Sequence, residues 1–207
     1  MTERPTYLRM LEAIANAERQ GHEYYQAWYE HATDPDLKET MRVVANRELE
    51  HSLAFTKRID ELGFECQPAD IIDFSKQIEI VTSDCSDYEK LEALELTDLK
   101  DKISDPENDP FRSLFNDLTI DVQTGALLGR YIAEERDSGR MLAACAETMV
   151  ARYGSADQSS GGATDDRLAG LEQKLDAICA AVEQLQATVS TQPAANGKGK
   201  SKARVTT

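Results

Sequence analysis

Two residue types that bind metal ions interrupt an apolar stripe in the stretch 35–62. Glu48 and His51 are three positions apart, so they lie on one face of a helix. The other residues on that face are apolar and recur every three or four positions: Leu37, Met41, Val44, Phe55, Ile59 and Leu62. Burying a carboxylate there costs free energy unless it is paired or bound to a cation. The Glu-x-x-His spacing therefore predicts part of a metal site.

A helix predicted over residues 5–32 must supply the partner of this motif. Glu18 sits in the middle of its apolar face, which also carries Leu8, Leu11, Ile14, Tyr25 and Trp28. In the turn that follows, Asp34 is a good N-cap and Pro35 suits the first position of a helix. We therefore expect an antiparallel helical hairpin whose second helix stops at Gly63.

Glu18 and Glu48 lie equally far along the chain from the centre of that turn, near residue 33. With a rise of about 1.5 Å per residue in both helices, the two carboxylates reach the same level of an antiparallel pair. The spacing therefore predicts that Glu18, Glu48 and His51 converge inside the hairpin.

The remaining sequence up to residue 153 predicts two further helices after a long connection over 64–86. A helix from Ser86 or Asp87 to about Ile103 would bury Leu91, Leu94, Leu99 and Ile103. A longer helix is expected over 111–153, with one stripe that includes Leu114, Leu118, Asp121, Leu128, Ile132, Glu135, Leu142 and Met149. Long crossover connections of this kind are usual in ferritin-like bundles. The predicted fold is thus an all-α, ferritin-like four-helix bundle over 1–153.

Glu135 is the candidate fourth ligand. It falls in the apolar phase of the helix 111–153, with Leu128 and Leu142 on the same face. Aligning Glu134 instead would bring Arg130, one turn earlier, into that face. We therefore predict Glu18, Glu48, His51 and Glu135 as the metal ligands.

Three C-terminal segments follow the predicted bundle. Residues 154–165 have the composition of a flexible linker, and residues 191–207 that of a disordered basic tail. Between them, residues 166–190 carry a coiled-coil heptad seam formed by Leu168, Leu171, Leu175, Ile178, Val182, Leu185 and Val189. This seam favours assembly into a homo-oligomer, and packing back onto the bundle is the alternative.

The net charge of −15 repels nucleic acid and attracts cations. No basic patch with interleaved aromatic residues indicates a nucleic-acid partner. An apolar run of membrane-spanning length and a signal-peptide pattern are both lacking, so no membrane partner and a cytoplasmic location are expected.

The hairpin sequence resembles the rubrerythrin-type family of ferritin-like proteins. The resemblance covers residues 8–62 and rests on these features: Glu18, Glu23-Tyr24-Tyr25, Thr33-Asp34-Pro35-Asp36-Leu37 and Glu48-x-x-His51. It implies a four-helix bundle with a non-haem di-iron site, to which each hairpin gives one Glu and one Glu-x-x-His. The resemblance is weaker over 111–150, where Ser138 stands in the place of the second His.

The resemblance implies iron as the cofactor, with ferroxidase or peroxidase-like oxidoreductase activity toward dioxygen or peroxide. Carboxylate and imidazole ligands suit iron, and manganese is the alternative metal. Three readings remain open. Glu135, with or without Glu134, completes an altered di-iron or single-metal centre. Two chains instead join their hairpins at a dimer interface, which resembles the arrangement in encapsulated ferritins. In the third, the bundle is a catalytically inactive structural or interaction protein.

Overall fold

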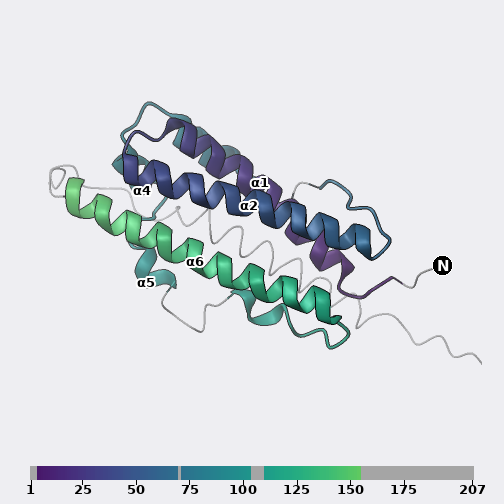
Figure 1. Ribbon diagram of the computed structural model, residues 1–207. Coiled ribbons are helices and arrows are strands. Elements are labelled where there is room, and N and C mark those ends of the chain that lie inside the picture. Colours follow the sequence, from purple (N-terminus) through teal and green to yellow (C-terminus); the bar gives the residue numbers. More distant parts are fainter. Residues whose placement is uncertain (1–3, 70, 104–109, 155–207) are drawn as a thin grey trace, which may run out of the picture.

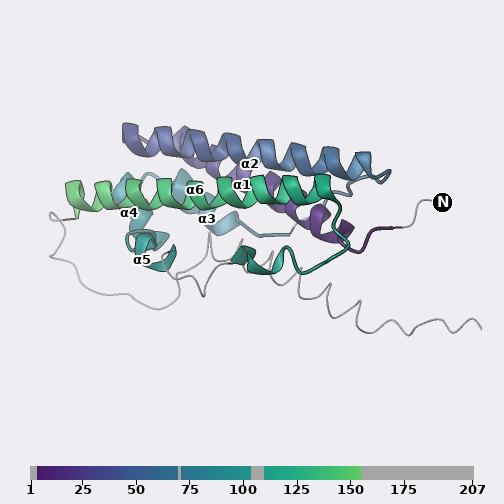
Figure 2. The ribbon, with the colours of Figure 1, turned by 60° about the horizontal axis from the view of Figure 1, so that its bottom comes forward.

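The computed structural model describes residues 4–69, 71–103 and 110–154 of the chain. Every regular element in these ranges is a helix, which confirms the all-α prediction. Three helices are long: α1 (Leu8–His31), α2 (Pro35–Glu61) and α6 (Val122–Tyr153). Helices α1 and α2 pack as an antiparallel hairpin, and α6 lies along its length (Figures 1 and 2). None of the described helices is both long enough and apolar enough to span a membrane.

The turn between α1 and α2 has the predicted chemistry. The side chain of Asp34 accepts hydrogen bonds from the backbone N–H groups of Asp36 and Leu37, and Pro35 occupies the first turn of α2. Gly63 follows the C-cap Leu62 with φ of +85°, a left-handed conformation that favours glycine. Local sequence therefore sets both ends of α2.

The predicted stripes of the hairpin form its core. Leu37, Met41, Val44, Phe55 and Ile59 of α2 are buried, as are Leu8, Leu11, Ile14, Tyr25 and Trp28 of α1. The polar side chains of Glu18, Glu48 and His51 are buried with them. Polar side chains thus interrupt the apolar face at the positions that the sequence indicated.

The continuous helix predicted up to Ile103 is wrong, because the chain breaks after its first two turns. Helix α4 (Asp87–Ala93) starts at the predicted cap, where Ser86 forms a capping box with Glu89, and α5 spans Leu99–Ile103. Between them Glu95 has φ of +52°. Leu94 and Leu96 flank it and both are buried, whereas positions two apart on one helix face opposite sides. Burying both leucines therefore requires the break.

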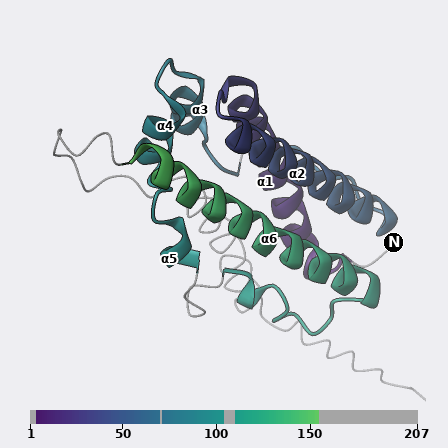
Figure 3. The same cartoon turned by 60° about the vertical axis from the view of Figure 1, so that its left-hand side comes forward.

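The short helices cover one side of the long ones. Helix α3 (Ser75–Thr82), the one regular element in the predicted connection 64–86, packs on α1, and α4 and α5 contact α6. Figure 3 shows α3 and α4 beside the α1–α2 turn, and α5 beside the C-terminal half of α6. The carboxylate of Asp87 anchors α4 by accepting hydrogen bonds from the backbone N–H groups of Thr33 and Asp34.

Helix α6 begins eleven residues later than the sequence predicted. Asp121 is its N-cap, with its side chain accepting from the N–H groups of Gln123 and Thr124, so it is not part of the apolar stripe. Leu118, also predicted in that stripe, is 97% exposed. In the described residues 110–120 the one regular element is a short 3₁₀ helix, η2 (Pro110–Ser113), whose Phe111 side chain is buried.

The described residues therefore contain three long helices rather than four. A ferritin-like four-helix arrangement stays a proposal. Apart from Gly154, the predicted linker 154–165, the heptad helix 166–190 and the tail 191–207 lie outside the described residues, and so do the predictions made for them.

Candidate metal centre

Ion pairs fix α6 against the hairpin near each of its ends and at its middle. The paired residues are Arg58 with Asp121, Arg152 with Asp34, and Arg47 with Asp137, at 2.9, 3.2 and 2.8 Å. Their order shows that α6 runs antiparallel to α2. Residues near position 134 of α6 therefore come to the level of His51.

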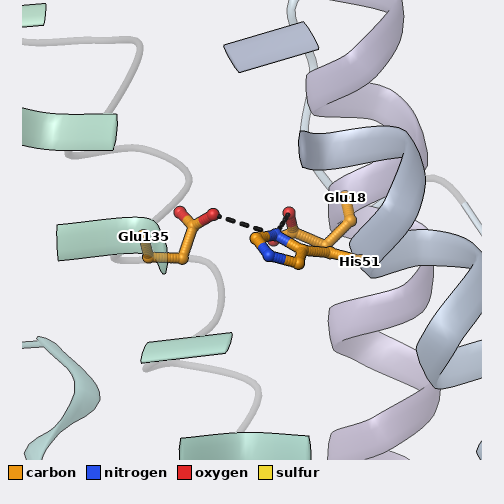
Figure 4. Close-up of side chains that lie close together, drawn as sticks. All are labelled: Glu18, His51 and Glu135. Carbon is orange, nitrogen blue, oxygen red and sulfur yellow. Dashed lines mark hydrogen bonds and ion pairs between the residues drawn. The ribbon is translucent and has the colours of Figure 1, made fainter. Parts of the chain in front are cut away.

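His51 is the centre of the site. Its Nδ1 lies 3.4 Å from Oε2 of Glu18 and 3.2 Å from Oε1 of Glu135. Its Nε2 lies 2.8 Å from Oε2 of Glu134. Figure 4 shows the side chains of Glu18, His51 and Glu135 pointing toward one another from α1, α2 and α6. Helix α1 thus brings one carboxylate, and α6 two, to the imidazole on α2.

The site is almost closed to water. Glu18 is 0%, His51 4% and Glu135 8% exposed, whereas the side chain of Glu134 is 29% exposed. Burial of ionisable groups is costly, and opposite charge or a metal ion must compensate for it. Glu134 marks the side of the cluster that is nearest to solvent.

The protonation of His51 reflects this environment. Burial lowers the pKa of the imidazole, but the contacts and negative charges of Glu135 and Glu18 outweigh it and raise the pKa to about 10. Without a metal ion the ring is therefore an imidazolium at neutral pH. Partial burial raises the pKa of Glu134, but Arg130 and His51 outweigh this effect and lower it. A cation thus already stands between the carboxylates.

Tyr131 is a site residue that sequence reasoning missed. Its hydroxyl donates a hydrogen bond to Oε1 of Glu18 at 2.9 Å. Its ring packs edge-to-face on His51, with the ring centroids 5.0 Å apart and the planes at 87°. The available signal was a tyrosine in the apolar phase of α6, one turn before Glu135, because a buried phenol needs a hydrogen-bond partner.

The same cluster has the dimensions of a metal site. One ligand atom each from Glu18, His51 and Glu135 lie within 4.8 Å of one another. Ligands at roughly 2.1 Å from a shared ion stand roughly 3 to 4 Å apart, so small side-chain rotations would close the cluster on an ion. In the described part of the chain, this is the one group of three or more His, Cys, Asp and Glu residues with such spacing.

The structure groups three of the four predicted ligands and leaves the fourth outside the group. It brings Glu18, His51 and Glu135 together, as the sequence predicted. Glu48 is buried in α2 with 1% exposure, one turn before His51, but it does not belong to that described group. Glu134, the alternative to Glu135, also contacts His51, at the other ring nitrogen. The roles of these residues as ligands stay predictions.

The second half of a di-iron site is lacking among the described residues. Ser138, which the sequence resemblance aligns with the second His of rubrerythrin-type proteins, is buried with 3% exposure. Nη1 of Arg47 donates to its Oγ at 3.2 Å, while Nη2 pairs with Asp137 at 2.8 Å. The Arg47 guanidinium therefore lies against the part of α6 that carries Ser138 and Asp137.

Comparison of the chain with protein-family models, with curated proteins and with solved structures found no match. Arguments about function therefore rest on the site itself.

Proposed function

We propose that the protein binds a metal ion through Glu18, His51 and Glu135. The observation that carries this proposal is the nearly complete burial of two carboxylates and an imidazole whose ligand atoms lie within 4.8 Å of one another. Surface clusters of acids are common without an ion, but buried carboxylates must be paired with an opposite charge or bound to a metal ion. The donor set of oxygen and nitrogen atoms suits divalent first-row metals.

His51 presents its two nitrogens in the way that metal-binding histidines do. Nδ1 faces both Glu18 and Glu135, so it is the atom that would bind the ion. Nε2 faces Glu134, which would accept the remaining N–H and hold the ring in one orientation. Metal binding would thus replace the proton on Nδ1 and leave the other contact in place.

Iron is the metal that we propose, with ferroxidase or peroxidase-like oxidoreductase activity. Mixed carboxylate and imidazole ligands suit iron, and the resemblance of residues 8–62 to rubrerythrin-type proteins supports it. Iron would supply one-electron redox chemistry toward dioxygen or peroxide. The chain's own residues would hold the ion and keep bulk water from it, since Glu18 and His51 are buried. Manganese is the alternative metal.

A second candidate function is that of a catalytically inactive structural protein. The ion-free geometry favours it in one respect, because both nitrogens of His51 already contact carboxylates. The imidazolium then links α1, α2 and α6 without a metal. Under this reading the chain would act through interaction or assembly.

Metal content separates the two functions. The protein is stripped with a chelator and dialysed against iron(II) without oxygen, and separately against manganese(II). Wild-type protein should retain metal after desalting, and His51→Ala should lose it. His22→Ala is the matched control, because His22 contacts the carbonyl of Ala45 outside the cluster and should not change metal content.

Activity is then measured with the loaded protein. Iron(II) oxidation by dioxygen or peroxide should be faster with wild type than with His51→Ala. A wild-type protein that folds but takes up neither metal would reject the metal-binding proposal and leave the structural one.

A further inference from the structure

We propose that the centre holds one metal ion per chain rather than a metal pair, because Tyr131 engages one oxygen of Glu18 and Arg47 brings a positive charge to the turn of α6 that follows Glu135. This inference rests on the proposed metal binding. It departs from the di-iron site that the family resemblance implies. Each of the two residues acts on a different part of the site.

Tyr131 restricts Glu18 to a single ligand atom. A carboxylate that bridges two metal ions commonly gives one oxygen to each of them. Oε1 of Glu18 accepts the hydrogen bond of the Tyr131 hydroxyl at 2.9 Å, and Oε2 lies 3.4 Å from Nδ1 of His51. Tyr131 is 1% exposed and its ring is enclosed by Phe55 and Phe111, so the phenol is held in this position. Glu18 is therefore poised as a one-oxygen ligand.

His51 is likewise limited to one ion. Nδ1 is the nitrogen that both Glu18 and Glu135 approach. Nε2 lies 2.8 Å from Glu134, which in turn accepts from Nε of Arg130 at 2.9 Å. The carboxylate of Glu134 is thus engaged by two donors, and it suits the role of orienting the ring.

Arg47 brings a positive charge to α6 about one turn after Glu135. It reaches from α2 to α6, where it donates to Ser138 and pairs with Asp137. The side chain of Arg47 is only 25% exposed, and a partly buried positive charge repels an approaching cation more strongly than a charge in bulk water does. The guanidinium therefore opposes a second metal cation and satisfies the polar groups that remain.

The stoichiometry of manganese(II) binding tests the inference. Stripped full-length protein is titrated with manganese(II), and bound metal is measured by equilibrium dialysis and elemental analysis. One ion per chain is expected, with the electron paramagnetic resonance spectrum of an isolated ion. Two ions per chain with a spin-coupled spectrum would overturn the inference while leaving the proposed function intact. One ion per two chains would also overturn it, in favour of a site at a dimer interface. No bound ion would reject both proposals.

A designed gain of binding tests the roles of the two residues. The triple variant Tyr131→Phe, Arg47→Met, Ser138→His removes both obstacles and adds the imidazole that the chain lacks. It should bind a second manganese(II) ion per chain. The control Arg42→Met removes an exposed arginine from the same helix, where it pairs with Glu39, and should bind one. A folded triple variant that still binds one ion would show that these residues do not set the limit.

Tyr131→Phe alone tests its positioning role if the triple variant does not fold. The aromatic ring stays, and only the hydroxyl is lost. Freeing Oε1 of Glu18 should alter the zero-field splitting of bound manganese(II). Tyr24→Phe is the matched control, since Tyr24 is a buried tyrosine that packs on Phe74. Identical spectra for Tyr131→Phe and wild type would overturn the role of Tyr131.

Discussion

Nε2 of His51 lies 2.8 Å from Oε2 of Glu134, on the side of the imidazole opposite to Glu18 and Glu135. This contact assigns different roles to two adjacent glutamates. Glu135 faces the buried cluster, and Glu134 orients the ring from the side nearer to solvent. The contact also shows how one turn of α6 can provide both a ligand and its support.

Glu134→Gln should weaken metal binding without abolishing it. Outer carboxylates that orient a metal-binding histidine typically contribute 10–100-fold in affinity, so a loss of roughly that size is expected. Dissociation constants for manganese(II) from equilibrium dialysis measure the effect. Glu147→Gln is the control, because Glu147 lies on the exposed side of α6 and pairs with Lys100. Equal losses in both variants would contradict the orienting role of Glu134.

Glu48→Gln should leave the metal stoichiometry unchanged. The sequence predicts Glu48 as a ligand, but the structure groups Glu18, His51 and Glu135 without it. Glu135→Gln, by contrast, removes a member of the group and should lower metal content sharply. Elemental analysis of the two desalted variants gives the answer. Loss of metal in Glu48→Gln would restore Glu48 to the ligand set.

Tyr131→Phe should destabilise the metal-free protein by about 1–3 kcal/mol, because it leaves Oε1 of Glu18 buried without its phenol donor. Urea denaturation followed by circular dichroism measures this free energy. Added manganese(II) should stabilise the variant by mass action if the site still binds. A change close to zero in the metal-free protein would show that the hydrogen bond is not needed for stability.

Asp121 should make folding sensitive to acid. Partial burial raises the pKa of Asp121, but hydrogen bonds from Tyr7, Thr124 and Arg58 outweigh it and hold the pKa well below its ordinary value. Stability from such a group is present above the unfolded-state pKa and is lost as the pH falls toward the folded-state value.

Asp121→Asn should therefore lower the melting temperature at neutral pH and lose less stability on acidification than wild type. Thermal unfolding at several pH values between neutral and strongly acidic measures both effects. Asp60→Asn, at an exposed position of α2, is the control and should follow the wild-type profile. If the melting temperature of Asp121→Asn falls as steeply on acidification as that of wild type, other carboxylates cause the acid sensitivity.

The helical hairpin and half of the candidate site could be predicted from the sequence because their geometry is local. A short turn with a capping Asp34 sets the register of α1 on α2, and constant helical rise then brings Glu18 to the level of His51. Periodicity also identified Glu135 as a residue on the inner face of α6. These inferences depend only on the sequence that lies near each residue in the chain.

Tertiary structure decided the rest. The axial position of α6 depends on ion pairs with distant residues, such as Arg47 with Asp137 and Arg58 with Asp121, which no local pattern encodes. The break at Glu95 likewise depends on burying both Leu94 and Leu96. The sequence by itself therefore determined which faces of α1 and α2 turn toward the core. Long-range packing determined that Glu135 and Tyr131 meet Glu18 and His51 there, since the rotation and shift of α6 are set by contacts far apart in the chain.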